Sequence, residues 1–234
     1  MINVLCADAS EGAILLVKTI KELGGTARRV ANLPNLGSQD IAINWGTRYQ
    51  GPILNGRARL IPGDKLKELH LFREAHVPTV EFSETRRTNG TWYARTAFHE
   101  GGSDLVANRE HGDYYVKHIN TDHEYRVYVF KDQTIGTGLK EPCERQYHPF
   151  LRSVQHGWDW SYKLTKVNRM ESRHIAREVA IKAIAAVGYD FGGVDVGIKP
   201  DGTPVVFEVN SRPGLDEYSA DRYATTFMEY ARSL

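Results

Sequence analysis

Two acidic residues lie in short alternating strands near the C-terminus. The stretch Gly192–Asn210 contains two apolar runs around Asp201-Gly202, a dipeptide typical of hairpin turns. A turn centred between those two residues places Asp195 directly opposite Glu208, with both side chains on one face. Asn210 follows two residues later and shares that face. The spacing therefore predicts a carboxylate pair with an amide beside it.

Facing carboxylates need a compensating cation. Their repulsion is worth only about 0.2 to 1 kcal/mol when exposed, but it grows when the pair is desolvated. Mg²⁺ takes carboxylate and amide oxygens and shares its remaining positions with water and phosphates. The alternative is a solvated polar face on which Asp195 and Glu208 point at water. The metal site is favoured because the opposite face is predicted to be apolar, which fixes the register; that face would be formed by Val194, Val196, Ile198, Val205, Phe207 and Val209.

The segment Glu208–Gly214 resembles the metal motif of the ATP-grasp superfamily of carboxylate-amine ligases. In that family a penultimate strand carries an Asp, and the next strand carries Glu-x-Asn ahead of Pro-Gly. Glu124-Tyr125-Arg126, Lys140 and Phe150–Ser153 further resemble the ribosomal-protein glutamate ligase (RimK-like) branch. The resemblance covers most of the chain after the first 60 residues. It implies an α+β fold in which two α+β subdomains clasp ATP.

The resemblance also implies cofactors and site residues. ATP would bind with two Mg²⁺ ions, Mn²⁺ being an alternative, and the metal ligands would be Asp195, Glu208 and Asn210. Catalytic contacts to the terminal phosphate, the acyl-phosphate or a substrate carboxylate would come from Arg126, Arg152 and Arg212. Nucleotide-binding residues would be Lys65, Arg95, Gly101, Gly102, Lys117, His118, Ile119, Glu124 and Lys140.

Each nucleotide-binding residue has an implied role. Arg95 stands where the family usually has a phosphate-binding lysine, and the Gly101-Gly102 loop would close over the phosphates. The segment 117–119 would line the adenine through backbone groups, and Glu124 would take the ribose hydroxyls. Lys140 and, more weakly, Lys65 would be further phosphate contacts.

Other interpretations of these residues stay open at the level of sequence. Arg126 could form a surface pair with Glu124, and Gly101-Gly102 could be an ordinary turn. The aromatic segment Trp158–Tyr162 either walls an acceptor pocket or packs at the edge of the core.

The surrounding elements divide the chain into two predicted domains. Residues 1–60 form a short N-terminal α/β layer with a strand at Ile2–Cys6, a helix capped by Ser10 and a strand at Ile41–Asn44. Residues 61–234 form the ATP-grasp domain, with a lid subdomain at about 61–113 and a metal and substrate subdomain at 114–234. The elements predicted there are a helix at Lys65–Ala75, a strand at Trp92–Thr96, an antiparallel meander through Tyr114–Ile119 and Glu124–Phe130, and a long helix closed by Gly188.

Composition excludes several classes of protein. The chain has 234 residues, 41% of them hydrophobic and 25% charged, which is typical of a globular protein. A net charge of +1 gives no overall field that would gather nucleic acid or membrane, and no apolar run reaches the length of a membrane helix. We therefore expect a cytoplasmic protein without a membrane partner. A nucleic-acid acceptor is disfavoured but stays open, as does oligomerisation, and Cys6 and Cys143 are expected to be free thiols.

These features predict an ATP- and Mg²⁺-dependent ligase that forms an amide bond through an acyl-phosphate. The substrates would be small-molecule or peptide carboxylates and amines. Val154 and Arg212 depart from the residues usual in the glutamate-adding branch, so substrate identity does not carry over. Two alternatives remain: a non-catalytic ATP-binding regulatory protein, and a kinase that stops at phosphoryl transfer.

Overall fold

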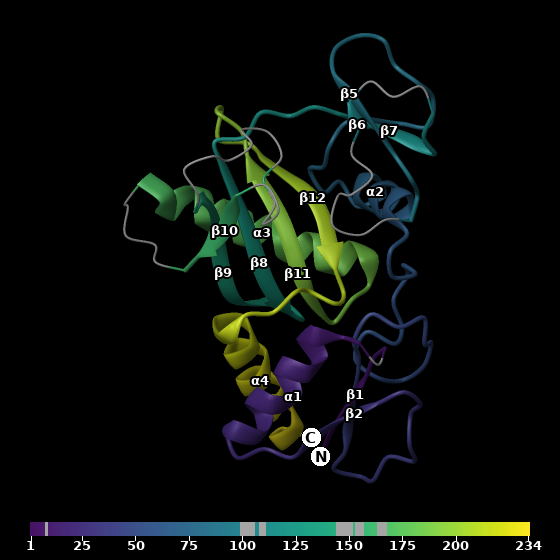
Figure 1. Cartoon of the computed structure of the whole chain (residues 1–234), viewed down its shortest axis with the longest axis vertical. Coiled ribbons are helices and arrows are strands. Elements are labelled where there is room, and N and C mark those ends of the chain that lie inside the picture. Colours follow the sequence, from purple (N-terminus) through teal and green to yellow (C-terminus); the bar gives the residue numbers. More distant parts are fainter. Residues whose placement is uncertain (8, 99–105, 108–110, 144–151, 153–156, 163–167) are drawn as a thin grey trace.

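The computed structural model describes the chain except for residues 8, 99–105, 108–110, 144–151, 153–156 and 163–167. The strands of these described residues form three sheets that are separate in space (Figure 1). The N-terminal sheet is parallel and has the order β2-β1-β3. Its strands are β1 (Ile2–Leu5), β2 (Ala27–Val30) and β3 (Ile41–Asn44), and it is accompanied by helix α1 (Glu11–Glu22).

The central sheet is antiparallel and has the order β10-β9-β8-β11-β12. Its strands are β8 (His123–Phe130), β9 (Gln133–Pro142), β10 (Trp158–Ser161), β11 (Phe191–Ile198) and β12 (Pro204–Asn210). The other antiparallel sheet has the order β4-β7-β5-β6. It comprises β4 (Phe82–Ser83), β5 (Trp92–Arg95), β6 (Val106–Ala107) and β7 (Tyr114–Lys117). The remaining helices are α2 (Lys65–Glu74), α3 (Asn168–Val187) and α4 (Glu217–Arg232).

Local sequence signals predicted several of these elements correctly. Ser10 is the N-cap of α1 and its Oγ accepts the Ala13 N–H at 3.4 Å, which satisfies a donor that the first turn leaves unpaired. Gly188 follows α3 with φ of 72°, a conformation that suits glycine because it has no Cβ. The predicted helix start at Lys65 is confirmed, with Asp64 as its N-cap. Local capping chemistry is enough to place these boundaries.

The predicted hairpin between Tyr114–Ile119 and Glu124–Phe130 is wrong. β7 pairs with β4 and β5, whereas β8 pairs with β9 and β11. The segment 118–122 therefore joins two different sheets instead of turning within one. Turn residues predict where the chain reverses direction, but they do not predict which strands then pair. The meander is correct for β8 and β9.

The two faces of the central sheet differ in chemistry. Because paired residues of adjacent strands point to the same face, the register separates a charged face from an apolar one. The apolar face carries Tyr125, Val127, Leu139, Val194 and Val196, which form a core cluster with α3. The opposite face carries Glu124 and Arg126 of β8, Asp195 of β11, and Lys140 of β9, and we call it the site face.

The N-terminal sheet and α4 pack around one end of the central sheet. A second core cluster joins residues of β1, β3 and α1 to Tyr128 of β8, Phe191 of β11 and Tyr223 of α4. Helices α1 and α4 lie side by side, and both chain termini lie near their lower ends in Figure 1. This packing covers one end of the sheet and leaves the end with Glu124 and Arg126 for the site. The domain boundaries at 60 and 113 stay predictions.

Cys6, which is buried, and Cys143, which is exposed, are thiols outside any disulfide, in agreement with the prediction. No helix in the described ranges is long and apolar enough to cross a membrane.

Candidate functional site

The predicted carboxylate pair is present at the edge of the central sheet. Asp195 of β11 lies directly opposite Glu208 of β12, as the sequence predicted. The register shifts between Asp195 and Val196, so that Val196 pairs with Val206 and Phe207 is left without a partner in β11. A β-bulge of this kind adds one residue to a strand and redirects side chains. The pairing was thus predicted correctly, but the hairpin contains an irregularity that a simple turn does not predict.

The bulge moves Phe207 to the site face. A Cβ on Gly197, which shares the face of Asp195, would lie 2.8 Å from Cε2 of Phe207 and 2.6 Å from Cγ2 of Thr121. The Phe207 ring therefore covers Gly197 on the charged side. The prediction that Phe207 lies on the apolar face with Val209 is wrong for this reason. The same shift pairs Val205 with Gly197, so Val205 also leaves the face on which it was predicted. Phe207 and Thr121 therefore both lie against Gly197 on this face.

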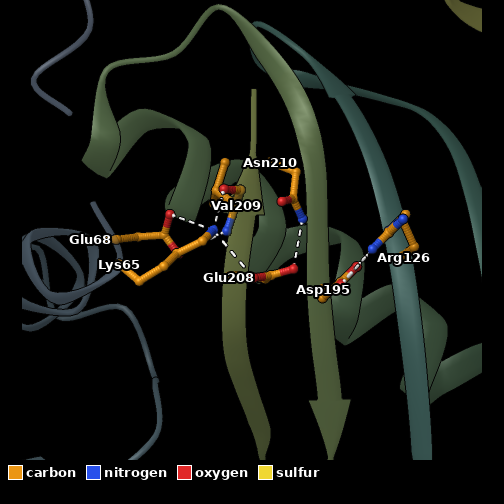
Figure 2. Close-up of polar contacts among 7 residues, drawn as sticks. All are labelled: Lys65, Glu68, Arg126, Asp195, Glu208, Val209 and Asn210. Carbon is orange, nitrogen blue, oxygen red and sulfur yellow. Dashed lines mark hydrogen bonds and ion pairs between the residues drawn. The ribbon is translucent and has the colours of Figure 1, made fainter. Parts of the chain in front are cut away.

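Each carboxylate of the pair has a cation of its own (Figure 2). Arg126 donates from Nε and Nη2 to the two oxygens of Asp195, both at 2.7 Å, and the side chains are 17% and 15% exposed. On the other side, Nζ of Lys65 lies 3.2 Å from Oε2 of Glu208. Asn210 donates from Nδ2 to Oε1 of Glu208 at 2.9 Å. Arg126 pairs with Asp195 and not with Glu124, which was the alternative left open by the sequence.

Lys65 also contacts a buried acid that the sequence did not single out. Its Nζ is 3.4 Å from Oε2 of Glu68 and donates to the Val209 carbonyl at 3.2 Å, while Oε1 of Glu68 accepts the Val209 N–H at 3.0 Å. Lys65 and Glu68 are 8% and 1% exposed. A glutamate in the first turn of a helix, such as Glu68 in α2, is usually a surface residue. Only the contact of Glu68 with β12 shows that it belongs to the site.

Burial and pairing shift the pKa values of this group in opposite directions. Burial raises the pKa of Glu68 to about 7, although Lys65 opposes it. Burial also acts to raise the pKa of Glu208, but Lys65, Asn210 and Arg126 outweigh it and hold that pKa below its usual range. For Lys65, burial acts to lower the pKa, and the facing carboxylates Glu208 and Glu68 raise it overall. Lys65 and Glu208 are therefore both charged at neutral pH.

A second charged group lies beside the first on the site face. Glu124 accepts the Thr121 hydroxyl at 3.2 Å and lies 3.6 Å from Nη1 of Arg152 and 3.8 Å from Nζ of Lys140. Burial raises the pKa of Glu124, with Lys140 and Arg152 opposing. Arg152 also donates to the Thr121 carbonyl at 2.7 Å. Three predicted site residues from β8, β9 and the loop before β10 thus converge.

Two tryptophans of β10 support these cations. Trp160 contacts both Arg126 and Lys140, each with its charged group 4.7 Å from the ring centre, and the Arg152 guanidinium lies 4.8 Å from the ring centre of Trp158. The pairing of Trp160 with Lys140 places both on the site face. Trp158 and Trp160 therefore stack on the site cations, and Trp158 is also buried at 7% exposure. Only the pairing of β10 with β9 could have shown this. The role of the segment as a wall of an acceptor pocket stays a prediction.

Other predicted residues lie farther from the carboxylate pair. Arg95 ends β5 in the four-stranded sheet, and Lys117 at the end of β7 pairs with Glu81 at 2.7 Å. The N–H groups of Lys117 and His118 donate to the Glu81 and Thr91 carbonyls, so these two donors are engaged in the protein. Residues 117–120 line an open pocket of about 480 Å³. The remaining wall of the pocket is formed by Thr79, Glu81, Lys199, Pro200 and Asp201.

Arg212 lies where the motif loop meets the N-terminal layer. A Cβ on Gly46, whose φ is 74°, would lie 2.6 Å from the Cβ of Arg212. The next residue, Pro213, is in contact with the start of α1, since its carbonyl oxygen would lie 3.2 Å from a Cβ on Gly12. The predicted role of Arg212 in binding a substrate carboxylate stays a prediction. Gly101, Gly102 and Val154 lie outside the described residues.

The carboxylate pair has the donor chemistry of a magnesium site. No group of three or more His, Cys, Asp or Glu side chains that could hold a metal occurs in the described part of the chain. Mg²⁺ is, however, commonly bound through one or two carboxylates plus water and phosphate oxygens. Each carboxylate oxygen of Asp195 and Glu208 has a second lone pair beyond its bond to a protein cation or amide. The pair therefore fits Mg²⁺ only together with outside ligands such as phosphates.

Comparisons with known proteins support the fold. No protein-family profile matches the sequence, and no curated protein sequence matches it. Among solved structures, the ATP-grasp ligase PsnB complexed with minimal precursor is similar, with a TM-score of 0.67, 13% identity and coverage of 97% of this chain and 98% of that chain. D-alanine–D-alanine ligase from Bacillus anthracis has a TM-score of 0.62, 13% identity and coverage of 99% and 98%.

A RimK domain protein from Sphaerobacter thermophilus is also similar, with a TM-score of 0.60, 16% identity and coverage of 96% and 98%. At these identities the likeness concerns the arrangement of the chain and not individual residues. The similarity extends over nearly the whole of each chain, the short N-terminal layer included. The chain therefore has the α+β ATP-grasp fold that its C-terminal motif predicted.

Proposed function

We propose that this protein is an ATP- and Mg²⁺-dependent carboxylate-amine ligase that forms an amide bond through an acyl-phosphate. The observation that carries the proposal is the site face of the central sheet. There a pair of carboxylates, Asp195 and Glu208, lies beside several converging cations: Lys65, Arg126, Lys140 and Arg152. Such a face suits a polyanion that arrives with a divalent metal. ATP with Mg²⁺ is such a ligand, and PsnB is solved with Mg and ADP.

Asp195, Glu208 and Asn210 would hold the metal. When bound, Mg²⁺ would neutralise negative charge on the β- and γ-phosphates during transfer. Phe207, on the same face, offers a flat apolar surface for the base, and Glu124 lies nearby to accept ribose hydroxyls. The segment 117–119 would contact the adenine from the side of the four-stranded sheet, and Arg95 would reach the phosphates. Gly101 and Gly102 would cover them.

The protein would contribute positioning and charge stabilisation to two displacement steps. In the first, a substrate carboxylate oxygen attacks the γ-phosphorus, the bond to the bridging oxygen breaks and ADP leaves. In the second, an amine nitrogen attacks the acyl carbon, phosphate leaves, and the nitrogen loses a proton to solvent. Arg126, Lys140 and Arg152 would stabilise negative charge on the transferred group and on the departing phosphate, and their convergence on the site face supports this role. Arg212 would bind the substrate carboxylate.

The substrate class we propose is an amino acid or a peptide. PsnB has been solved with precursor peptide PsnA2 and AMPPNP, and D-alanine–D-alanine ligase has the same fold. Both kinds of substrate present a carboxylate and an amine. We also propose a cytoplasmic location, where ATP and reduced thiols are available.

ADP release would test the reaction. The purified protein is incubated with ATP and Mg²⁺, and amino acids or short peptides are supplied singly and in pairs. A ligase gives ADP and phosphate that depend on a particular carboxylate and amine, together with an amide detected by mass spectrometry. ATP binding without amino-acid-dependent ADP in any mixture would contradict the proposal. A stable phosphorylated product without an amide would instead indicate a kinase.

A second candidate is a nucleotide-binding regulatory protein without turnover. It is favoured by one observation: both metal-site carboxylates already have protein cations, Arg126 on Asp195 and Lys65 on Glu208. Replacing Glu208 with Gln separates the two candidates. The substitution should abolish turnover of a ligase, whereas a protein that needs only nucleotide occupancy would keep its ligand response.

A further inference from the structure

Strand β12 is an edge strand of the central sheet, and a pair of side chains from α2 caps its outer side at the metal site. The outward backbone groups of Val209 are satisfied by the first turn of α2: Glu68 accepts its N–H and Lys65 donates to its carbonyl (Figure 2). Further along, the Val206 N–H donates to the Pro78 carbonyl at 2.8 Å. The edge strand is therefore fixed on both sides of the bulge that carries Phe207 and Glu208.

Lys65 is held between two carboxylates. Its Nζ lies 3.4 Å from Glu68 and 3.2 Å from Glu208, and its side chain is only 10% exposed. The Glu68 side chain is 2% exposed. A buried ammonium without its partners is costly, so its position is set by the acids around it. Glu68 is the partner on the side away from the site, and its removal would leave Lys65 paired with Glu208 alone.

We propose that Glu68 is a positioning residue of the metal site, acting through Lys65 to orient Glu208 towards Asp195. This inference rests on the proposed function, because it assumes that Glu208 binds Mg²⁺ together with a nucleotide. Glu68 shares the charge of Lys65 and so limits how strongly the ammonium competes with a metal for Glu208. In its ionised form Glu68 also adds negative charge beside the site. Both effects favour metal binding.

The variant Glu68→Gln separates positioning from a purely structural role. Gln keeps a carbonyl oxygen that can accept the Val209 N–H and has nearly the same shape, but it lacks the charge. We expect the Mg²⁺ concentration that half-saturates ADP binding to rise about fivefold, because Lys65 then competes fully for Glu208. ADP affinity in EDTA should stay within about twofold of the original protein. Isothermal titration with ADP over a Mg²⁺ series measures both.

Two further variants complete the design. Glu74→Gln, in the same helix but at a side chain that is 64% exposed and paired with Arg59, is the matched control and should leave the Mg²⁺ dependence unchanged. In a Lys65→Met background, Glu68→Gln should shift half-saturating Mg²⁺ by less than about twofold, because its effect passes through Lys65. Melting temperatures in EDTA establish that each variant is folded. If Glu68→Gln is unfolded, the double variant is compared with Lys65→Met by the same criterion.

The outcomes distinguish the inference from the proposed function. Unchanged Mg²⁺ dependence in Glu68→Gln, or an equal shift with and without Lys65, would overturn the positioning role. If the original protein fails to bind ADP at any Mg²⁺ concentration, the proposed function itself is wrong. A rise in half-saturating Mg²⁺ that occurs in Glu68→Gln but is absent in the Lys65→Met background supports Glu68 as a positioning residue.

Discussion

Replacement of Arg126 by Met should destabilise the protein strongly. Arg126 makes two bonds of 2.7 Å to Asp195, and the two side chains are 17% and 15% exposed. Removing one partner of a buried ion pair costs about 3–5 kcal/mol, whereas breaking an exposed pair costs about 0–1 kcal/mol. The partial exposure places Arg126 at the lower end of the buried range. We therefore expect a loss of about 3 kcal/mol, which for a chain of this size lowers the melting temperature by roughly 6–12 °C.

The assay is urea or thermal unfolding in EDTA, followed by the same measurement in Mg²⁺. Arg59→Met is the control, because its pair with Glu74 is 50% and 64% exposed and should contribute about 0–1 kcal/mol. Adding Asp195→Asn to Arg126→Met should recover part of the loss, since no uncompensated carboxylate remains. Mg²⁺ should stabilise Arg126→Met more than the original protein because the metal replaces the missing charge.

Two results would refute this reasoning. A loss below about 1 kcal/mol for Arg126→Met would show that the pair behaves as a surface contact. Strict additivity of the Arg126 and Asp195 substitutions would show that the two side chains do not interact energetically. In either case the bidentate pair would not be what holds Asp195 in the site.

Three further predictions follow from the same geometry. Trp160→Leu should weaken the binding of AMPPNP about five- to thirtyfold relative to ADP, because each of the stacked cations Arg126 and Lys140 contributes about 0.5–1 kcal/mol. Trp160→Phe should keep most of the affinity ratio between the two nucleotides, and an equal loss for both would contradict an anion-positioning role. Gly197→Ala should destabilise the fold by about 1–3 kcal/mol and reduce nucleotide affinity, because the new Cβ would lie 2.6 Å from Thr121 and 2.8 Å from Phe207. An unfolding midpoint equal to that of the original protein would show that Phe207 moves freely. Burial raises the pKa of Glu68 from 4.5 to about 7, so folding disfavours its ionised form, and its contribution to stability is present below pH 4.5 and is lost as the pH rises through about 7. The free energy of unfolding should therefore decline more steeply across that range for the original protein than for Glu68→Gln, and parallel pH profiles would disprove the shift.

The sequence predicted a good part of the candidate site because some of its contacts are local. Asp195 and Glu208 belong to one hairpin, so alternation and a turn signal were enough to place them opposite each other. The position of Phe207 was not predictable in this way. A bulge shifts the register of all the residues on one side of it, and the alternating apolar pattern does not reveal that shift. Glu68 gave no signal either, because an acid in the first turn of a helix is an ordinary N-terminal residue.

By itself, the sequence determined the helix caps, the acidic hairpin and the motif that indicates the ATP-grasp fold. These features depend on neighbours within a few residues or across one turn, where backbone geometry alone dictates proximity. Only the tertiary structure decided that Arg126 neutralises Asp195, that Lys65 reaches Glu208, and that Trp160 supports two cations. Those contacts depend on which strands and helices become neighbours, and that choice is made by burial of the apolar face against α3 and not by the charged residues themselves.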